Sequence, residues 1–136
     1  ASDIINEIQK LPQGAKVVIY APLVREKKGT WADLIENLRG KGYVRAQIDG
    51  VQVRLDEEIE LAKTKKHTIK LIVDRIVIDA GNAQRLAQDV EKALNESYGE
   101  VEIEIANAQE LGLKESFIHY SEHSACFDCK ISFFSL

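Results

Sequence analysis

Lys65-Lys-His-Thr-Ile-Lys-Leu-Ile-Val-Asp-Arg-Ile-Val-Ile78 is the stretch of sequence that decides the fold. It begins with basic residues that are typical of a loop. The remainder is rich in β-branched and apolar side chains, which predicts a long strand over residues 67–78. The charged pair Asp74-Arg75 interrupts the apolar run in the middle of that strand. Charged side chains in such a position need partners, either within the protein or across an interface.

Sequence periodicity on both sides of this strand predicts helices separated by hairpins. Some segments have apolar residues at three- and four-residue spacing, as amphipathic helices do, and others are β-rich or alternate apolar with polar residues, as strands do. Asp49-Gly50 is a strong signal for a two-residue hairpin turn. The expected helices cover residues 30–40 and 83–97, and the expected strands cover residues 16–21, 43–48, 51–55, 67–78, 100–105 and 117–120.

The boundaries of these elements come from residues that start or stop regular structure. We expect Pro22 to end the first strand, with residues 25–29 as an exposed loop. Thr30 and Asn82 are the expected N-caps of the two helices, and Gly40 is the expected stop of the first. These elements together predict an α/β (α+β) fold, a mostly antiparallel sheet with two helices packed on one face.

Length and composition limit the class of protein. A chain of 136 residues fits one domain and buries roughly two-thirds of its surface. Apolar residues at 45% and charged residues at 29% argue against a disordered, collagen-like or membrane protein. We expect a cytoplasmic protein, because no apolar stretch approaches a membrane span and the N-terminus lacks a signal-peptide pattern. The net charge of −4 gives no general attraction to phosphates.

Few residues in the chain carry the patterns of catalytic chemistry. His67, His119 and His123 lack the spacing of a zinc-binding pair on a helix, and residues 40–42, Gly-Lys-Gly, lack the spacing of a phosphate-binding loop. Ser121 near His123 lacks the strained turn of a serine nucleophile. A small enzyme would need titratable groups clustered in a pocket, which a sequence does not display. We therefore expect no catalysis by this chain.

Cys126 and Cys129 form a Cys-x-x-Cys pair, and two thiolates at this spacing can chelate one zinc ion. The pair is a half-site, because a tetrahedral site needs two more ligands and residues 130–136 contain none. His123 would add a third ligand and leave the fourth missing. The alternative is a thioredoxin-like redox pair, but such a pair stands at a helix start after a βαβ unit. A chain cut within a longer zinc module explains the pair better.

Three motifs carry a family resemblance. They are Ala21-Pro-Leu-Val-Arg-Glu-Lys-Lys-Gly29, Gly42-Tyr-Val-Arg-Ala-Gln-Ile-Asp-Gly50, and Lys65-Lys-His-Thr-Ile followed by Val73-Asp-Arg-Ile-Val. In their order and spacing they resemble UvrA, the damage-recognition family of excinuclease ABC, and the resemblance runs from about Ile4 to Cys126. It implies a non-catalytic protein-interaction domain that is inserted in the first ATP-binding half and docks the helicase UvrB in bacterial nucleotide excision repair. The ABC-type ATPase would lie outside this chain.

The resemblance also implies which residues meet UvrB. Positions used in the family match Arg45, Arg75 and Glu91. A further acidic position falls on Gln88, and the acid stands instead at Asp89, about 100° further around the helix. Asp89 is therefore the fourth expected contact residue. An exposed ion pair adds only about 0.2–1 kcal/mol to folding, whereas close pairs across an interface couple by about 1.5–7 kcal/mol. Docking therefore explains charged residues in a strand better than stability does.

The resemblance divides the chain into a UvrB-interaction domain, residues 1–120, and the start of a truncated zinc module, residues 121–136. In the family, the pair matching Cys126 and Cys129 opens a four-cysteine site, although Phe127 and Lys130 depart from the usual surroundings. Zinc and ATP are implied for the parent protein and no cofactor for this chain. UvrB is the expected partner, and we expect the chain itself to be monomeric.

Basic residues suggest an alternative function. Lys27, Lys28, Lys65 and Lys66 lie in two basic segments that DNA would approach in the parent complex. A small nucleic-acid-binding α/β module would use these segments, with aromatic residues such as Tyr43 for base stacking. One tyrosine is a poor stacking platform, and a solvated surface also explains the lysines. DNA binding that falls steeply with salt would favour this alternative.

Overall fold

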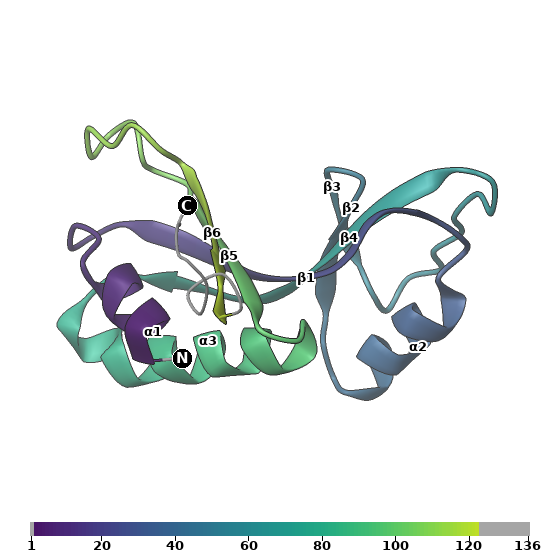
Figure 1. The fold of residues 1–136 in the computed structure, drawn as a ribbon, viewed down its shortest axis with the longest axis horizontal. Coiled ribbons are helices and arrows are strands. Elements are labelled where there is room, and N and C mark those ends of the chain that lie inside the picture. Colours follow the sequence, from purple (N-terminus) through teal and green to yellow (C-terminus); the bar gives the residue numbers. More distant parts are fainter. Residues whose placement is uncertain (1, 123–136) are drawn as a thin grey trace. The chain divides into compact units, whose positions relative to one another are not determined.

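The structure is a computed structural model that describes residues 2–122. Its strands form a six-stranded antiparallel sheet in the order β3-β2-β4-β1-β5-β6, accompanied by helices, which confirms the predicted α+β class (Figure 1). The elements are α1 (Ser2–Gln9), β1 (Lys16–Lys28), α2 (Ala32–Gly40), β2 (Arg45–Ile48), β3 (Val51–Arg54), β4 (Lys66–Val77), the 3-10 helix η1 (Ala80–Asn82), α3 (Ala83–Glu96), β5 (Glu100–Ile105) and β6 (Phe117–Ser121).

The chain forms two compact units. Unit 1 takes its described residues from 2–21 and 73–122, and unit 2 is Pro22–Ile72. Strand β1 begins in unit 1 and ends in unit 2, and β4 begins in unit 2 and ends in unit 1. The stretch that decides the fold therefore contributes a half-strand to each unit.

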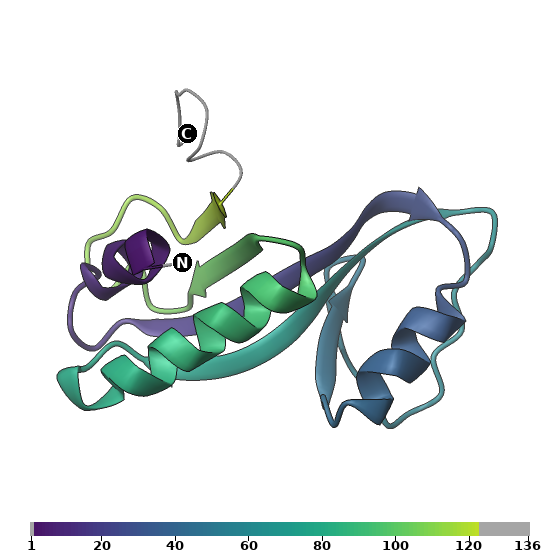
Figure 2. The ribbon, with the colours of Figure 1, turned by 60° about the horizontal axis from the view of Figure 1, so that its bottom comes forward.

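In unit 1, α3 lies along the sheet and packs against β5 and α1 (Figure 2). Leu86, Val90 and Ala93 recur at the spacing of one helix face and are buried. The pairing of β5 with β1 and β6 supplies the opposing apolar layer, in which Ile103 is fully buried. Helix α1 was not predicted. Its buried residues are Ile4 and Ile8.

In unit 2, β2 and β3 form the hairpin that the sequence predicts. Asp49 and Gly50 have φ angles of 53° and 83°, so both central residues of the turn are left-handed, as a type I′ turn requires. Ala46 and Ile48 are buried in the register of β2 with β4, where Ala46 lies opposite Leu71. The alternation of buried and exposed residues fixes which face of the hairpin meets the core.

The predicted start of α2 is wrong, whereas its predicted end at Gly40 is confirmed. Thr30 does not cap the helix, because Trp31 takes a left-handed conformation with φ 55° and the helix begins at the next residue. The indole of Trp31 lies against Gly29, and its Nε1 donates to the Lys27 carbonyl at 3.2 Å. At the other end, the helix stops at Gly40 as predicted, and Gly42, with φ 91°, follows it in a left-handed conformation.

Pro22 does not end the first strand, and residues 25–28 belong to β1 instead of a loop. Proline lacks the N–H that a ladder needs and is tolerated where a strand is not paired on that side. The pairing of β1 with β5 covers Val17 to Tyr20 only, so Pro22 falls beyond that ladder. None of the helices within residues 2–122 is long and apolar enough to cross a membrane.

Candidate partner-binding surface

Three of the predicted contact residues are exposed charged side chains. Arg45 lies on β2, Arg75 on β4 and Glu91 on α3, and all three are exposed. Within residues 2–122, none of their side chains has a hydrogen bond or ion pair. Arg45 belongs to unit 2 and the other two belong to unit 1. These charges therefore contribute little to the stability of the fold.

The other half of the charged interruption, Asp74, has its partner inside unit 1. Arg85 at the start of α3 donates two hydrogen bonds of 2.8 Å to the carboxylate, from Nε to Oδ2 and from Nη2 to Oδ1. Its Nη2 also donates to the carbonyl oxygen of Arg75 at 3.2 Å. Such a two-pronged pair fixes geometry as well as charge. The sequence analysis missed Arg85, because the pair forms only when α3 packs on β4.

Asp89, the fourth predicted contact residue, is buried. Its residue exposure is 8%, and its Oδ2 has no hydrogen-bond partner within the described chain. Burial and the neighbouring Asp74 raise the pKa of Asp89 to about 7. Burial also opposes ionisation of Asp74, but hydrogen bonds from Arg85 and Asp89 outweigh it and lower the pKa of Asp74 to about 2. Asp89 therefore belongs to an internal cluster with Asp74 and Arg85 and is not an exposed contact residue.

Arg75 and Asp74 point to opposite faces of the sheet, because neighbouring residues of a strand alternate. Asp74 faces α3 through its bond to Arg85, so alternation turns Arg75 away from α3. On that side the Arg75 charge acts on Tyr20, whose hydroxyl donates to Glu104 Oε1 at 2.7 Å. Burial and the Glu104 hydrogen bond raise the pKa of Tyr20, so this hydroxyl stays protonated. Arg75 and Glu91 thus lie on different sides of unit 1.

The two basic segments lie side by side in unit 2. The Glu26 N–H donates to Thr68 Oγ1 at 3.2 Å, which places the end of β1 beside the start of β4. The structure therefore gathers four exposed lysines at neighbouring strand ends. They are Lys27, Lys28, Lys65 and Lys66.

His67 is a buried structural residue in unit 2, with 5% exposure. Its Nδ1 lies 2.7 Å from Asp49 Oδ2, and its Nε2 lies 2.8 Å from the carbonyl oxygen of Ala62. Both neighbours are acceptors, so the ring satisfies both when it is the doubly protonated imidazolium. Asp49 Oδ1 also accepts the Thr68 N–H at 2.8 Å. His67 therefore ties the hairpin turn to β4 and to the preceding segment, and neither ring nitrogen is free for a metal.

The charge state of His67 can be measured directly. The hydrogen bond to Asp49 raises the pKa of His67 above its usual 6.5, and the same bond lowers the pKa of Asp49. We expect NMR titration of the imidazole to give a pKa above 6.5 in the wild type and a lower one in Asp49→Asn. Because the folded pKa exceeds the unfolded one, the stability from His67 is complete below pH 6.5 and is lost as pH rises through the folded pKa. Equal pKa values in the two proteins would contradict the ion pair.

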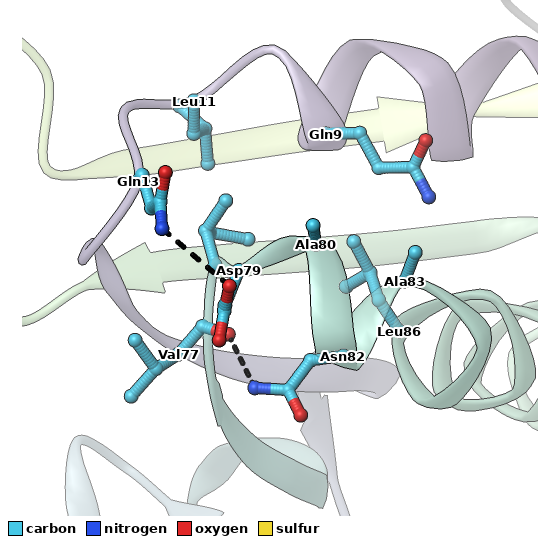
Figure 3. A pocket seen from close by; sticks show the side chains of 10 residues that line it. Gln9, Leu11, Gln13, Val77, Asp79, Ala80, Asn82, Ala83 and Leu86 are labelled. Atoms are coloured by element: carbon cyan, nitrogen blue, oxygen red, sulfur yellow. Dashed lines mark hydrogen bonds between the residues drawn. The ribbon is translucent and has the colours of Figure 1, made fainter.

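Unit 1 has a hollow of about 310 Å³ where α1, the end of β4, η1 and the start of α3 meet (Figure 3). Gln13 Nε2 donates to Asp79 Oδ1 at 3.5 Å, and Asn82 Nδ2 donates to the Val77 carbonyl at 2.9 Å. Asn82 stands at the predicted cap position, but its side chain makes no cap bond to α3. The hollow offers one carboxylate among amides and apolar side chains, which is not an arrangement of nucleophile and base.

The expected zinc half-site, Cys126 and Cys129, lies outside the residues that the structure describes, as does His123. Between residues 2 and 122, no three histidine, cysteine, aspartate or glutamate side chains are grouped so that they would hold a metal ion.

The chain is similar in sequence to one family model and to several curated proteins of the same name. The sequence model described as "UvrA interaction domain" matches residues 1–107. The protein named UvrABC system protein A of Helicobacter pylori strain J99 is 57% identical over 133 residues, which are 98% of this chain and 14% of that protein. Its namesakes in Clostridium perfringens strain 13 and Bacillus subtilis strain 168 are 41% and 38% identical over 130 and 129 residues, in each case 95% of this chain and 13% of the relative.

The chain thus spans about 14% of the length of the curated relatives that it matches. The match covers both units, since it includes β1, the β2–β3 hairpin, β4 and α3. It also includes Arg45, Arg75 and Glu91, the exposed charges without internal partners. On this evidence the chain belongs to the UvrA interaction domain family.

Proposed function

We propose that this domain docks UvrB and so helps to pass damaged DNA between repair subunits in bacterial nucleotide excision repair. The observation that carries the proposal is the state of Arg45, Arg75 and Glu91. They occupy positions where the family resemblance implies contact, and they are exposed without a hydrogen bond or ion pair among the described residues. Side chains that folding does not use are available to a partner.

The energetics favour docking as the use of these charges. An exposed ion pair inside the domain would contribute about 0.2–1 kcal/mol, because water and salt screen it. A carboxylate of a partner that excludes water from an arginine fork would couple by about 1.5–7 kcal/mol. The placement of Arg75 and Glu91 on different sides of unit 1 implies that a partner contacting both reaches around an edge of this unit.

In this proposal the domain itself is not catalytic. The hollow beside α3 holds no nucleophile–base pair, and Asp74, Arg85 and Asp89 form an internal ion cluster. ATP hydrolysis and zinc binding would belong to the parent protein, and the cytoplasm would be the place of action.

Calorimetric titration of this chain with purified UvrB tests the proposal. We expect saturable one-to-one binding, weakened at least about tenfold, or 1.4 kcal/mol, by Arg75→Ala and by Arg45→Ala. Glu91→Gln should weaken binding in the same direction if its carboxylate meets a cation. Lys92→Ala and Lys63→Ala are matched controls, because they remove exposed charges from the same two units. Their affinity for UvrB should stay within about twofold of wild type.

A folded wild-type chain that shows no UvrB binding would refute the proposal. The nucleic-acid alternative rests on the four lysines that the Glu26–Thr68 contact brings together. Docking predicts that added duplex DNA leaves the affinity for UvrB unchanged. A chain that instead binds the duplex, with an affinity that falls steeply with salt, would favour the alternative.

A further inference from the structure

Strand β3 is an edge of the sheet and pairs only with β2 among the described strands (Figure 1). In a two-residue hairpin the residues that flank the turn, here Ile48 and Val51, bond to each other, so the next residue turns its backbone groups outward. That residue is Gln52. No turn, loop or side-chain hydrogen bond in residues 2–122 engages its N–H or C=O. An edge with such groups is a template for an added strand.

A hollow of about 540 Å³ runs along this edge. One wall is the hairpin, from Ile48 to Arg54, and the other is formed by residues 57–61. In that second wall, no backbone hydrogen bond within the described chain engages residues 58–61. The hollow is therefore a groove whose two walls both carry backbone groups without protein partners, and such groups need water or another chain.

The second wall is held at both ends. Arg39 of α2 donates from Nε to the Leu55 carbonyl at 2.5 Å and from Nη2 to the Glu57 carbonyl at 3.1 Å. At the far end, His67 bonds the Ala62 carbonyl at 2.8 Å. These anchors keep the segment beside β3 without pairing it to β3. Because the groove is preformed, a peptide that binds in it causes a smaller loss of conformational entropy.

The residues that line the groove indicate which kind of ligand would bind in it. Its charged residues are four acids, Asp49, Glu57, Glu58 and Glu60, and one base, Arg54. Asp49 is already paired with His67 and Arg54 with Asp56, each at 2.7 Å, so the three glutamates set the charge that an occupant meets. The acidic lining repels a phosphate backbone and attracts lysine and arginine. Val51 is 62% exposed, and Ile59 and Leu61 are half-buried, so apolar side chains also find contacts.

We propose that this groove binds a short, extended, basic segment of a partner protein as an added strand beside β3. The segment would lie about 4.8 Å from β3 and bond the outward groups of Gln52. Its lysine or arginine side chains would meet the glutamates of the second wall. The proposal does not depend on UvrB docking, because it uses a different set of residues and a different kind of contact.

Fluorescence anisotropy with labelled peptides tests the groove. The probes are an eight-residue peptide of alternating lysine and valine, its glutamate–valine counterpart, and a lysine–valine peptide N-methylated on alternate residues to block backbone pairing. We expect the 136-residue chain to bind the first saturably and the other two at least about tenfold more weakly. Equal binding of the three peptides, or no binding of the first, would refute the proposal.

Two variants separate backbone pairing from charge. Gln52→Pro removes the outward N–H, and proline is tolerated on an edge strand where that N–H faces solvent. Glu58→Lys combined with Glu60→Lys reverses the charge of the second wall and leaves β3 intact. Each should weaken the lysine–valine peptide at least about tenfold, whereas Glu110→Lys, an exposed acid in unit 1, should not.

Trp31 fluorescence reports whether the variants fold, since it is the single tryptophan and lies in unit 2. If Gln52→Pro does not fold, the variant that combines Glu58→Lys with Glu60→Lys tests whether the groove is the peptide-binding site. Full-affinity binding by that variant refutes the groove as the site. Concentration-dependent dimerisation that Gln52→Pro abolishes, without peptide binding, also refutes the proposal, because the occupant would then be a second copy of this chain.

Discussion

Replacing Leu71 with alanine should lower the free energy of unfolding by about 2–5 kcal/mol. Leu71 is fully buried in β4, where it lies opposite Ala46 of β2 in the antiparallel register. Ala46 is too small to fill the space that truncation would leave, and Ile69, two residues away on the same face, is held by the pairing of the same strands. The variant therefore loses both apolar burial and the contacts around a cavity.

Urea denaturation followed by Trp31 fluorescence measures this effect in unit 2. Val44→Ala is the matched control, because Val44 is 56% exposed and its truncation should change stability by no more than about 0.5 kcal/mol. A Leu71→Ala protein as stable as the control would contradict the burial of Leu71 and the register of β2 with β4.

Local signals in the sequence predicted the centre of the fold. The strand expected over residues 67–78 is observed as β4, Lys66–Val77, because a run of β-branched residues leaves few other conformations open. The hairpin was predicted for a similar reason, since Asp49 and Gly50 both tolerate the left-handed angles that its turn needs. These features depend on residues close together in sequence.

The features that the sequence analysis missed depend on residues far apart in sequence. Pro22 is a strand breaker by local rules, yet β1 continues through it, because the ladder with β5 ends at Tyr20. Arg85 carried no local sign of its role, since its partner Asp74 lies on another element. The Thr30 cap failed because the indole packing of Trp31 delays the start of α2.

In the candidate site, too, some features could be predicted from the sequence and one was missed. Exposure of Arg45, Arg75 and Glu91 follows from strand alternation and helix periodicity, which the sequence contains. The burial of Asp89 was also present in the sequence, because it lies three residues after Leu86 and four before Ala93 on the apolar face of α3. Charged residues are rarely buried, so an acid in that stripe is easily predicted to be an exposed contact residue.

Asp89→Asn should stabilise the protein by about 1–3 kcal/mol at pH 8, relative to its effect at pH 4, because the amide removes a buried charge that lacks a full set of partners. The folded pKa of Asp89 is raised from 3.8 to about 7, so the wild type keeps a proton that its unfolded chain has lost. Wild-type stability therefore falls as pH rises from 3.8 to 7. Asp89→Asn does not show this decrease, because its amide does not titrate. The contribution of His67 is common to both proteins, and that of Asp74 is lost only below pH 3.8, outside the pH range compared.

Denaturation of both proteins at pH 4, 6 and 8 measures the difference, with Glu91→Gln as the control that removes an exposed negative charge from the same helix. That control should shift stability by no more than about 0.5 kcal/mol at every pH. A difference between Asp89→Asn and wild type that does not change with pH would mean that Asp89 is already ionised in the folded protein.

Because Asp89 is buried next to the Asp74–Arg85 pair, the stabilised variant should also bind UvrB within about twofold of wild type. A large loss of affinity would instead show that the carboxylate reaches the partner, and that α3 opens around Asp89 when the partner docks.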